Sequence, residues 1–202
     1  MSLENITSFY AIKKKHLNVF IFLVVLGITC LITVFALYMV SREYHDTKKT
    51  FIQYSWILIL IGTLILWYAY IYNRKKKFKV DIVSKGKSLS IQVWDPELPS
   101  PLFINYPFIV KKQWIEMHRP KGPKGRKAFI TILDKLNEPI ATFFYDLGYT
   151  KTDLTGYEFM DINRFKNPDK LTLANLQYSM SKLVQMEGKL SGIIQSLETT
   201  NF

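Results

Sequence analysis

Two long runs of apolar residues without a charge constrain this chain more than any other feature. The first run covers residues 18–40, the second covers residues 54–72, and a polar gap of residues 41–53 separates them. An uncharged apolar run of about 18 or more residues is long enough to cross the hydrocarbon core of a bilayer as a helix. The first run exceeds the apolar part of a secretory signal peptide, and no cleavage pattern follows Val40. The two runs therefore predict a retained transmembrane helical hairpin.

The charges beside the runs predict the orientation of the hairpin. Residues 13–15 supply three lysines before the first run, residues 74–79 supply five Lys or Arg after the second, and the gap holds three. Cytoplasmic loops carry an excess of Lys and Arg, so we expect a multi-pass protein of the plasma (inner) membrane with both termini in the cytoplasm. Neither run has an acidic or basic residue at its centre, which favours an anchor over a pore. Gly27 and Gly62 could allow the two helices to approach closely.

The residues before the hairpin form a separate cytoplasmic segment, 1–17. We expect it to be either a short helix at the lipid surface, with Phe9, Tyr10 and Ile12 touching the lipid, or a disordered tail. The net charge of the chain is +11, which favours polyanionic partners. For an anchored chain the lipid bilayer is the nearest polyanion. Nucleic acid is not an expected partner, because no recognition helix or aromatic stacking platform is evident.

A soluble cytoplasmic domain is expected over residues 78–202, with its strands in residues 78–146. Apolar and polar residues alternate over residues 78–83 and 88–94 around a Gly86 turn, which predicts a β-hairpin. Further strands are expected over residues 108–118, 129–133 and 139–145. Five or six short strands without crossover helices favour a small antiparallel barrel or sandwich.

The end of the domain predicts one long helix over residues 168–198. Asn167 is a suitable N-cap, and Pro168 occupies the first helical position. Apolar residues then recur at three-four spacing: Leu173, Leu176, Met180, Leu183, Leu190, Ile194 and Leu197. This stripe either packs onto the β-domain or forms a helix interface with a protein partner or a second copy, giving a homo-oligomer. Gly188 and Gly192 lower its helix propensity.

The order of these elements resembles the bacterial membrane-anchored proteins with a pleckstrin-homology-like domain. The residues that carry the resemblance are the two apolar runs, the strand series of residues 78–145 and the helix from Pro168. The resemblance implies a membrane α-hairpin plus an α+β soluble domain, in which a small antiparallel PH-like barrel is closed by the C-terminal helix. It also implies binding or scaffolding and not catalysis.

A basic stretch is the main candidate for a lipid- or partner-binding site. Its cations are Lys111, Lys112, Arg119, Lys121, Lys124, Arg126 and Lys127. Gly and Pro residues within it predict an exposed loop between two strands. The loop either contacts lipid headgroups or an acidic protein surface, or is a solvated hairpin tip.

No pattern in the chain indicates catalysis. The sequence has three histidines and a single cysteine, Cys30, and it lacks zinc-binding, nucleophile-elbow and phosphate-loop motifs. We therefore predict no enzyme, no cofactor and no metal site. The expected function is a membrane-anchored scaffold or accessory subunit that docks protein partners at the cytoplasmic face of a bacterial plasma-membrane assembly. The alternative is an anionic-lipid surface sensor that acts through the basic loop of residues 119–127, and an enzyme with an unrecognised site is the third possibility.

Overall fold

The structure, a computed structural model, describes residues 4–43, 48–117, 125–149, 152–160 and 171–199, and the side chains of residues 41–53 are outside the description. The chain divides into two compact units. The helical unit is Lys14–Lys77, and the sheet unit combines Met1–Lys13 with Phe78–Phe202. The helical unit is thus inserted into the sequence of the sheet unit.

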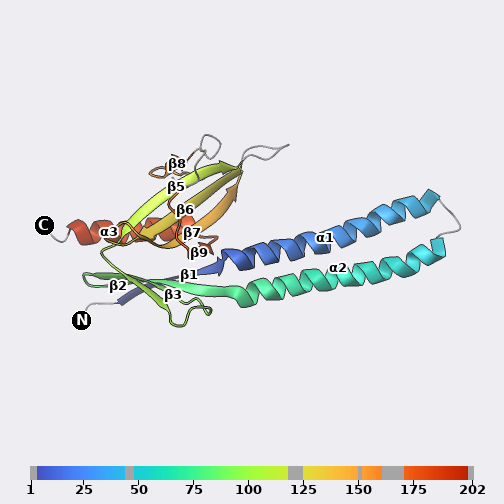
Figure 1. Cartoon of the computed structure of the whole chain (residues 1–202), viewed down its shortest axis with the longest axis horizontal. Helices are drawn as coiled ribbons and strands as arrows, with labels where there is room; N and C mark the ends of the chain where they lie inside the picture. The colour runs from blue at the N-terminus through green and yellow to red at the C-terminus, as the bar shows by residue number, and fades with distance from the viewer. Residues whose placement is uncertain (1–3, 44–47, 118–124, 150–151, 161–170, 200–202) are drawn as a thin grey trace. The chain divides into compact units, whose positions relative to one another are not determined.

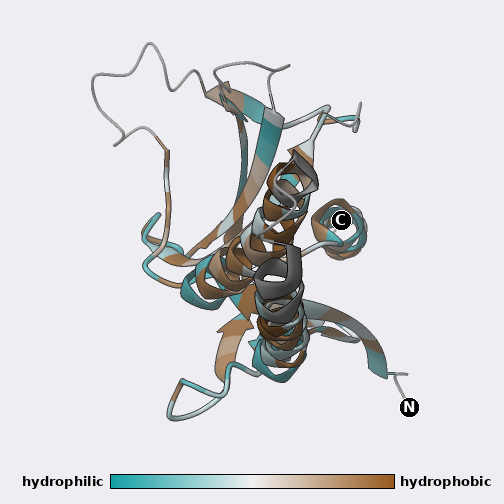
Figure 2. Ribbon diagram, turned by 90° about the vertical axis from the view of Figure 1, so that its right-hand side faces the viewer, coloured by the Kyte–Doolittle hydropathy of each residue, from teal (hydrophilic) through white to brown (hydrophobic). Residues whose placement is uncertain are grey.

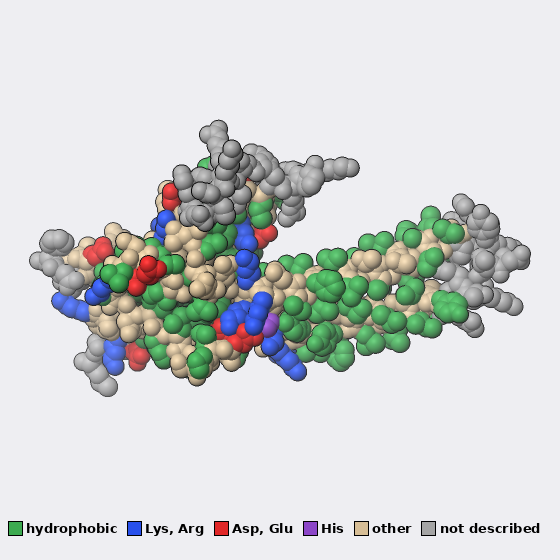
Figure 3. Space-filling model, in the orientation of Figure 1, with side chains coloured by type: hydrophobic (Ala, Val, Ile, Leu, Met, Phe, Trp, Pro, Cys, Tyr) green, Lys and Arg blue, Asp and Glu red, His purple; other side chains and the backbone are tan. Residues whose placement is uncertain are grey.

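The helical unit consists of α1 (Lys14–Glu43) and α2 (Lys48–Lys76) (Figure 1). Both helices contain a segment that is long and apolar enough to cross a membrane, Lys14–Val40 in α1 and Tyr54–Lys76 in α2. Only 6% and 11% of the most apolar windows of these segments is buried, whereas a core helix of a soluble protein would be mostly buried. Apolar colour runs along both helices in Figure 2, and apolar side chains cover their surface in Figure 3. Apolar surface of this extent matches a lipid environment.

Two glycines set the closest approach of α1 and α2. A Cβ atom at Gly27 would lie 2.7 Å from Cγ of Leu66, and one at Gly62 would lie 3.2 Å from the carbonyl oxygen of Gly27. No side chain fits at Gly27 unless Leu66 shifts. The structure therefore confirms the expectation that these glycines permit close packing, which in membranes depends on small residues at helix crossings.

Nine strands of the described chain form one mixed sheet. They are β1 (Glu4–Lys13), β2 (Lys77–Lys85), β3 (Ser88–Val93), β4 (Leu102–Asn105), β5 (Ile109–Met117), β6 (Gly125–Leu133), β7 (Pro139–Gly148), β8 (Glu158–Met160) and β9 (Gln177–Ser179). Their order across the sheet is β4-β3-β2-β1-β9-β7-β6-β5-β8 (Figure 1). The expected strands of residues 78–145 are present as β2, β3, β5, β6 and β7. β4 and β8 fall in residues 102–105 and 157–162, where the sequence allowed one further strand, and the structure adds β1 and β9.

The N-terminal segment is a strand, and the expectation of an interfacial helix or a disordered tail is wrong for residues 4–13. β1 lies between β2 and β9, so it joins the β2–β4 part of the sheet to the β5–β9 part. Phe9, Ala11 and Ile12 are buried in the sheet unit, so Phe9 and Ile12 are not the lipid-facing residues that the sequence suggested. Buried and exposed side chains alternate over only a few residues of β1, which is a weak pattern for a strand. Its partner strands are also distant in sequence, so no neighbouring segment indicated the pairing.

The sheet is not a simple antiparallel meander. Most neighbouring strands pair antiparallel, as expected, with β2–β3, β3–β4, β5–β6 and β6–β7 following one another along the chain. However, β8 pairs parallel to β5, and β9 pairs parallel to β7. Both short strands come from the C-terminal part of the chain, which returns to the sheet at two places. Such returns depend on pairing partners remote in sequence.

The C-terminal helix, α3, is shorter than predicted. It covers Leu183–Thr199 and not residues 168–198. The residues before it are extended, because the segment enters the sheet as β9: Thr142 N–H donates to the Leu176 carbonyl, and Met180 N–H donates to the Phe144 carbonyl, both at 2.9 Å. The N-cap and first turn expected around Pro168 lie outside the described residues. The apolar residues of 173–180 are therefore spaced as in a helix but belong to an extended segment, which buries alternate side chains.

One hydrophobic core unites the sheet unit. It includes Phe9 and Ala11 of β1, strand residues on both sides of β1, and the α3 residues Leu183, Met186, Leu190 and Leu197. On the other face of β5–β7, buried threonines hold the segment before β9. Thr131 Oγ1 donates to the Thr172 carbonyl at 2.8 Å, and Ala174 N–H donates to Thr142 Oγ1 at 2.8 Å. These bonds satisfy buried polar groups and fix the segment on the sheet.

Candidate membrane anchor and interaction surfaces

The junctions between the two units contain no linker residues. β1 ends at Lys13 and α1 begins at Lys14, while α2 ends at Lys76 and β2 begins at Lys77. β1 and β2 are also neighbours in the sheet. Both helices are thus covalent continuations of adjacent strands. Arg74, Lys75 and Lys76 occupy the last turn of α2, where cations favour the negative end of the helix dipole.

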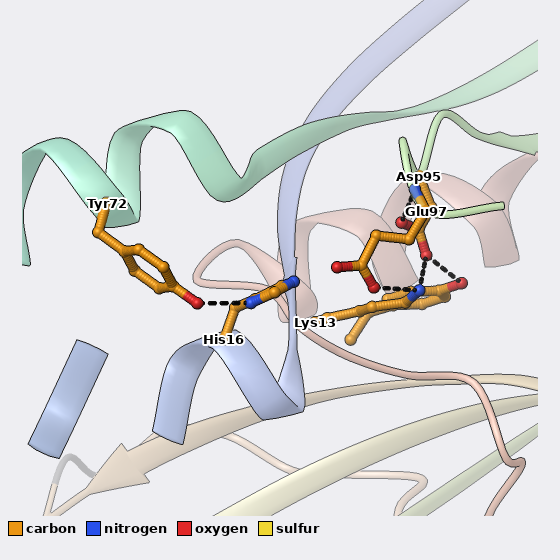
Figure 4. A network of polar contacts seen from close by, with 6 residues as sticks. Lys13, His16, Tyr72, Asp95 and Glu97 are labelled. Atoms are coloured by element: carbon orange, nitrogen blue, oxygen red, sulfur yellow. Dashed lines mark hydrogen bonds and ion pairs between the residues drawn. The ribbon is translucent and has the colours of Figure 1, made fainter. Parts of the chain in front are cut away.

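Lys13, the last residue of β1, is held by two carboxylates (Figure 4). Its Nζ lies 2.8 Å from Oδ2 of Asp95 and 3.0 Å from Oε2 of Glu97. The Asp95 side chain is only 1% exposed, and it also accepts hydrogen bonds from the Tyr178 hydroxyl at 3.4 Å and from the Glu97 N–H at 3.0 Å. We call Lys13, Asp95, Glu97 and Tyr178 the β1 clamp. It connects β1 to β9 and to the loop after β3.

The electrostatics of the β1 clamp favour a charged lysine. Burial by itself lowers the pKa of Lys13, but the hydrogen bonds and charges of Asp95 and Glu97 outweigh burial and raise the pKa above its ordinary value. The pKa of Tyr178 is also raised, first by burial and then by Asp95. The clamp therefore keeps a neutral phenol and a charged ammonium on one buried carboxylate. The bonds of Lys13 and Tyr178 to Asp95 therefore hold the end of β1 in place.

A polar contact also joins the two helices within the helical unit. Nδ1 of His16 and the hydroxyl of Tyr72 are 2.7 Å apart, and the two rings meet edge-to-face with centroids 5.8 Å apart (Figure 4). His16 lies in the first turn of α1, and Tyr72 lies near the end of α2. An aromatic residue with a polar tip at the end of an apolar helix is typical of a membrane–water interface.

The predicted basic site is not a cluster of free cations among the residues described. Lys111 Nζ donates to Thr172 Oγ1 at 2.8 Å, and Lys112 Nζ pairs with Glu187 Oε1 at 3.0 Å. Lys127 Nζ lies over the Phe144 ring, 4.3 Å from its centroid. Arg119, Lys121 and Lys124 lie outside the described residues. The Lys112 pair also explains the charged Glu187 among the apolar residues of α3.

Arg126 belongs instead to an aromatic surface at the edge of the sheet. Its guanidinium lies over the Trp114 ring, 5.2 Å from the centroid, and the Trp114 ring packs against Phe159 at 4.5 Å. Phe159 is on the short edge strand β8 and is 48% exposed. Aromatic residues and arginine are enriched at protein interfaces.

The residues of the predicted helix interface are used inside the sheet unit. Leu183, Leu190 and Leu197 lie in α3 and are buried in the core, as is Met180 before the helix. Leu176 and Ile194 are partly buried against the same core, and Leu173 is half-buried in the segment before β9. The apolar stripe therefore covers the sheet of its own chain.

Trp94 is a surface residue that the sequence did not single out. Its indole N–H donates to Asp81 Oδ2 at 3.0 Å, and Lys79 Nζ lies 3.0 Å from the same oxygen. Asp81 is buried, and its Oδ1 has no hydrogen-bond partner in the part of the chain described. The sequence also did not indicate the β1 clamp, because Lys13 and Asp95 are far apart along the chain and are brought together only by the sheet.

Comparisons with known proteins assign no relative. No protein-family model matches the chain, and no match was found among curated proteins or solved structures. Within the described ranges, no three His, Cys, Asp or Glu residues are grouped so that they could hold a metal ion.

Proposed function

We propose that this protein is a non-enzymatic, membrane-anchored scaffold or accessory subunit, whose sheet unit docks protein partners at the cytoplasmic face of a plasma-membrane assembly. One observation carries the proposal: the two apolar helices continue directly into neighbouring strands, at Lys13/Lys14 and Lys76/Lys77. No residues separate strand and helix at either junction, so the sheet unit is joined to the proposed anchor by two short covalent connections. Short connections limit how far the sheet unit can move from the membrane, where a docking module of an assembly is needed.

The surface of the sheet unit supports docking. The Trp114, Phe159 and Arg126 surface combines exposed aromatic area with a cation. Such residues supply most of the binding energy at protein interfaces. A PH-like domain of a bacterial membrane protein, as the sequence pattern implied, is a binding module of this kind. Its support here is a largely antiparallel sheet with a C-terminal helix packed in its core.

Membrane topology is the first test. The chain has a single cysteine, Cys30, so a Cys30→Ala background allows site-directed labelling. Leu136→Cys, at a residue 80% exposed in the sheet unit, should react with an impermeant maleimide only after the cells are lysed. The matched Thr50→Cys, between the two apolar runs, should react in intact spheroplasts. Labelling of Leu136→Cys in intact spheroplasts would contradict a cytoplasmic sheet unit.

Partner docking is the second test. The full chain, extracted in mild detergent from its own cells, should migrate on native gels with co-purifying proteins. Trp114→Ala and Phe159→Ala should release those proteins, whereas Leu136→Ala should retain them. A strict monomer without any partner would refute the scaffold. Salt-sensitive binding of that monomer to anionic vesicles, lost in a Lys121→Ala, Lys124→Ala, Arg126→Ala and Lys127→Ala variant, would favour the lipid sensor.

A further inference from the structure

Three exposed aromatic residues lie on the face of the sheet that points away from the core. Tyr10 lies between the buried residues Phe9 and Ala11, so it projects from the opposite face of β1. Val93 of β3 is buried, so Trp94 projects the other way, and its ring contacts Phe103 of β4 edge-to-face at 6.5 Å. Tyr10, Trp94 and Phe103 are 65%, 44% and 53% exposed. We call these three residues the outer aromatic face.

One residue of this face and the hydrogen-bonded partner of another are only a short stretch of chain away from the ends of the apolar helices. Trp94 lies opposite Lys79, because the Trp94 N–H donates to the Lys79 carbonyl at 2.9 Å. Lys79 is three residues beyond Lys76, where α2 ends. Since consecutive Cα atoms are about 3.8 Å apart, the Cα atoms of Lys76 and Lys79 are at most about 11 Å apart. Tyr10 is similarly only four residues before Lys14, where α1 begins.

Charge and side-chain chemistry match the headgroup layer of a bilayer. Lys79 lies beside Trp94, and its Nζ is 3.0 Å from the carboxylate of Asp81. The Asp81 carboxylate, which holds the Trp94 indole, is thus paired with a lysine. Trp and Tyr are enriched at membrane–water interfaces, because their rings are apolar and their tips are polar. The Trp94 indole is held in place by Asp81, which leaves the exposed part of its ring free to contact lipid.

We propose that the outer aromatic face contacts the lipid headgroup layer, so that the sheet unit rests on the membrane surface. The ligand is a phospholipid surface and not a protein. This inference rests on the proposed membrane anchoring. It adds a second, peripheral contact to the anchor and leaves the Trp114 surface, on the other part of the sheet, for protein partners.

The four tryptophans of the chain provide the test. Trp56 and Trp67 lie in α2, Trp94 follows β3, and Trp114 lies in β5. Three full-length variants each keep one of Trp67, Trp94 and Trp114, with the other tryptophans replaced by Phe. They are reconstituted in nanodiscs of phosphatidylcholine and phosphatidylglycerol that carry a nitroxide either on the headgroup or deep in the acyl chain.

Trp94 emission should be lost with the headgroup label and largely retained with the deep label. Trp114 emission should be retained with both labels. Lipid quenching of Trp67 but not of Trp94 would overturn the inference while leaving the anchor intact. Absence of quenching at Trp67 would refute the anchor itself. A second measurement uses the unmodified chain, so it does not depend on the folding of the tryptophan variants. A lipid with a photoactivatable headgroup should crosslink to the peptide of residues 94–105. Crosslinks confined to the helices would refute the contact.

Discussion

Removal of β1 should abolish the folding of the sheet unit, although this strand precedes the helices by sequence. Phe9, Ala11 and Ile12 are 6%, 2% and 5% exposed. Burial of a Phe or Ile side chain stabilises a protein by about 1.5–3 kcal/mol, and burial of a methyl group by about 0.8 kcal/mol. The three side chains of β1 thus contribute about 4–7 kcal/mol. A domain has a total stability of about 5–15 kcal/mol, so the loss equals the whole stability of a domain at the lower end of that range.

The matched comparison uses two soluble chains. One is residues 77–202 alone, and the other joins residues 4–13 to residues 77–202 through a Gly/Ser linker of about six residues, which spans about 12–15 Å. Packed helices have axes about 8–10 Å apart, so this linker can replace the helical unit between β1 and β2. We expect cooperative urea unfolding, followed by circular dichroism, only for the rejoined chain. Ala11→Asp in the rejoined chain should remove that transition.

The reasoning would be refuted if residues 77–202 alone unfolded cooperatively at the same urea concentration as the rejoined chain. That result would mean that β2 and β9 do not need β1 between them. It would also restore the sequence-based division, in which residues 78–202 form a complete domain.

Three further predictions concern single sites. Lys13→Met should lower the free energy of unfolding of the sheet unit by about 3–5 kcal/mol, the range for breaking a buried ion pair. In thermal unfolding, the double variant Lys13→Met with Asp95→Asn should recover part of this loss. Additive losses of stability from the two substitutions would show that the residues do not interact. The pKa of Lys13 is raised in the folded chain, so the stabilisation by its charge is fully present below the unfolded pKa of about 10.4 and is lost as pH rises through the higher folded value. The difference in stability between the wild-type chain and Lys13→Met should therefore be constant from neutral pH to about pH 9. It should fall above about pH 10. Gly27→Leu should separate the two helices, seen as faster proteolysis in detergent, because its Cβ would meet Leu66 at 2.7 Å; unchanged protection would refute the close crossing. Gly188→Ala should raise stability by about 0.8–1 kcal/mol, since a Cβ there meets nothing within 4 Å and Ala is the better helix former; a loss of stability would show that this face of α3 is covered.

The sequence alone determined the features that depend on local patterns. Two uncharged apolar runs predicted α1 and α2, because a long, largely apolar helix without charged side chains needs an apolar environment. Alternation over residues 78–94 predicted the β2–β3 hairpin, since successive side chains of a strand point to opposite faces. The close approach at Gly27 and Gly62 was also expected from residue size.

Only the tertiary structure decided which distant segments pair. β1 and β9 are short, and their places in the sheet depend on partners far along the chain, such as Tyr178 opposite Lys13. The fate of the basic residues was likewise decided by folding, because Lys112 meets Glu187 only when α3 packs in the core. Local sequence specifies which side of an element is apolar, whereas burial against a distant segment selects the partner, since hydrophobic burial is not directional. The presence of two apolar helices followed by a strand-rich part was therefore legible in the sequence, but the insertion of the helices between two neighbouring strands was not.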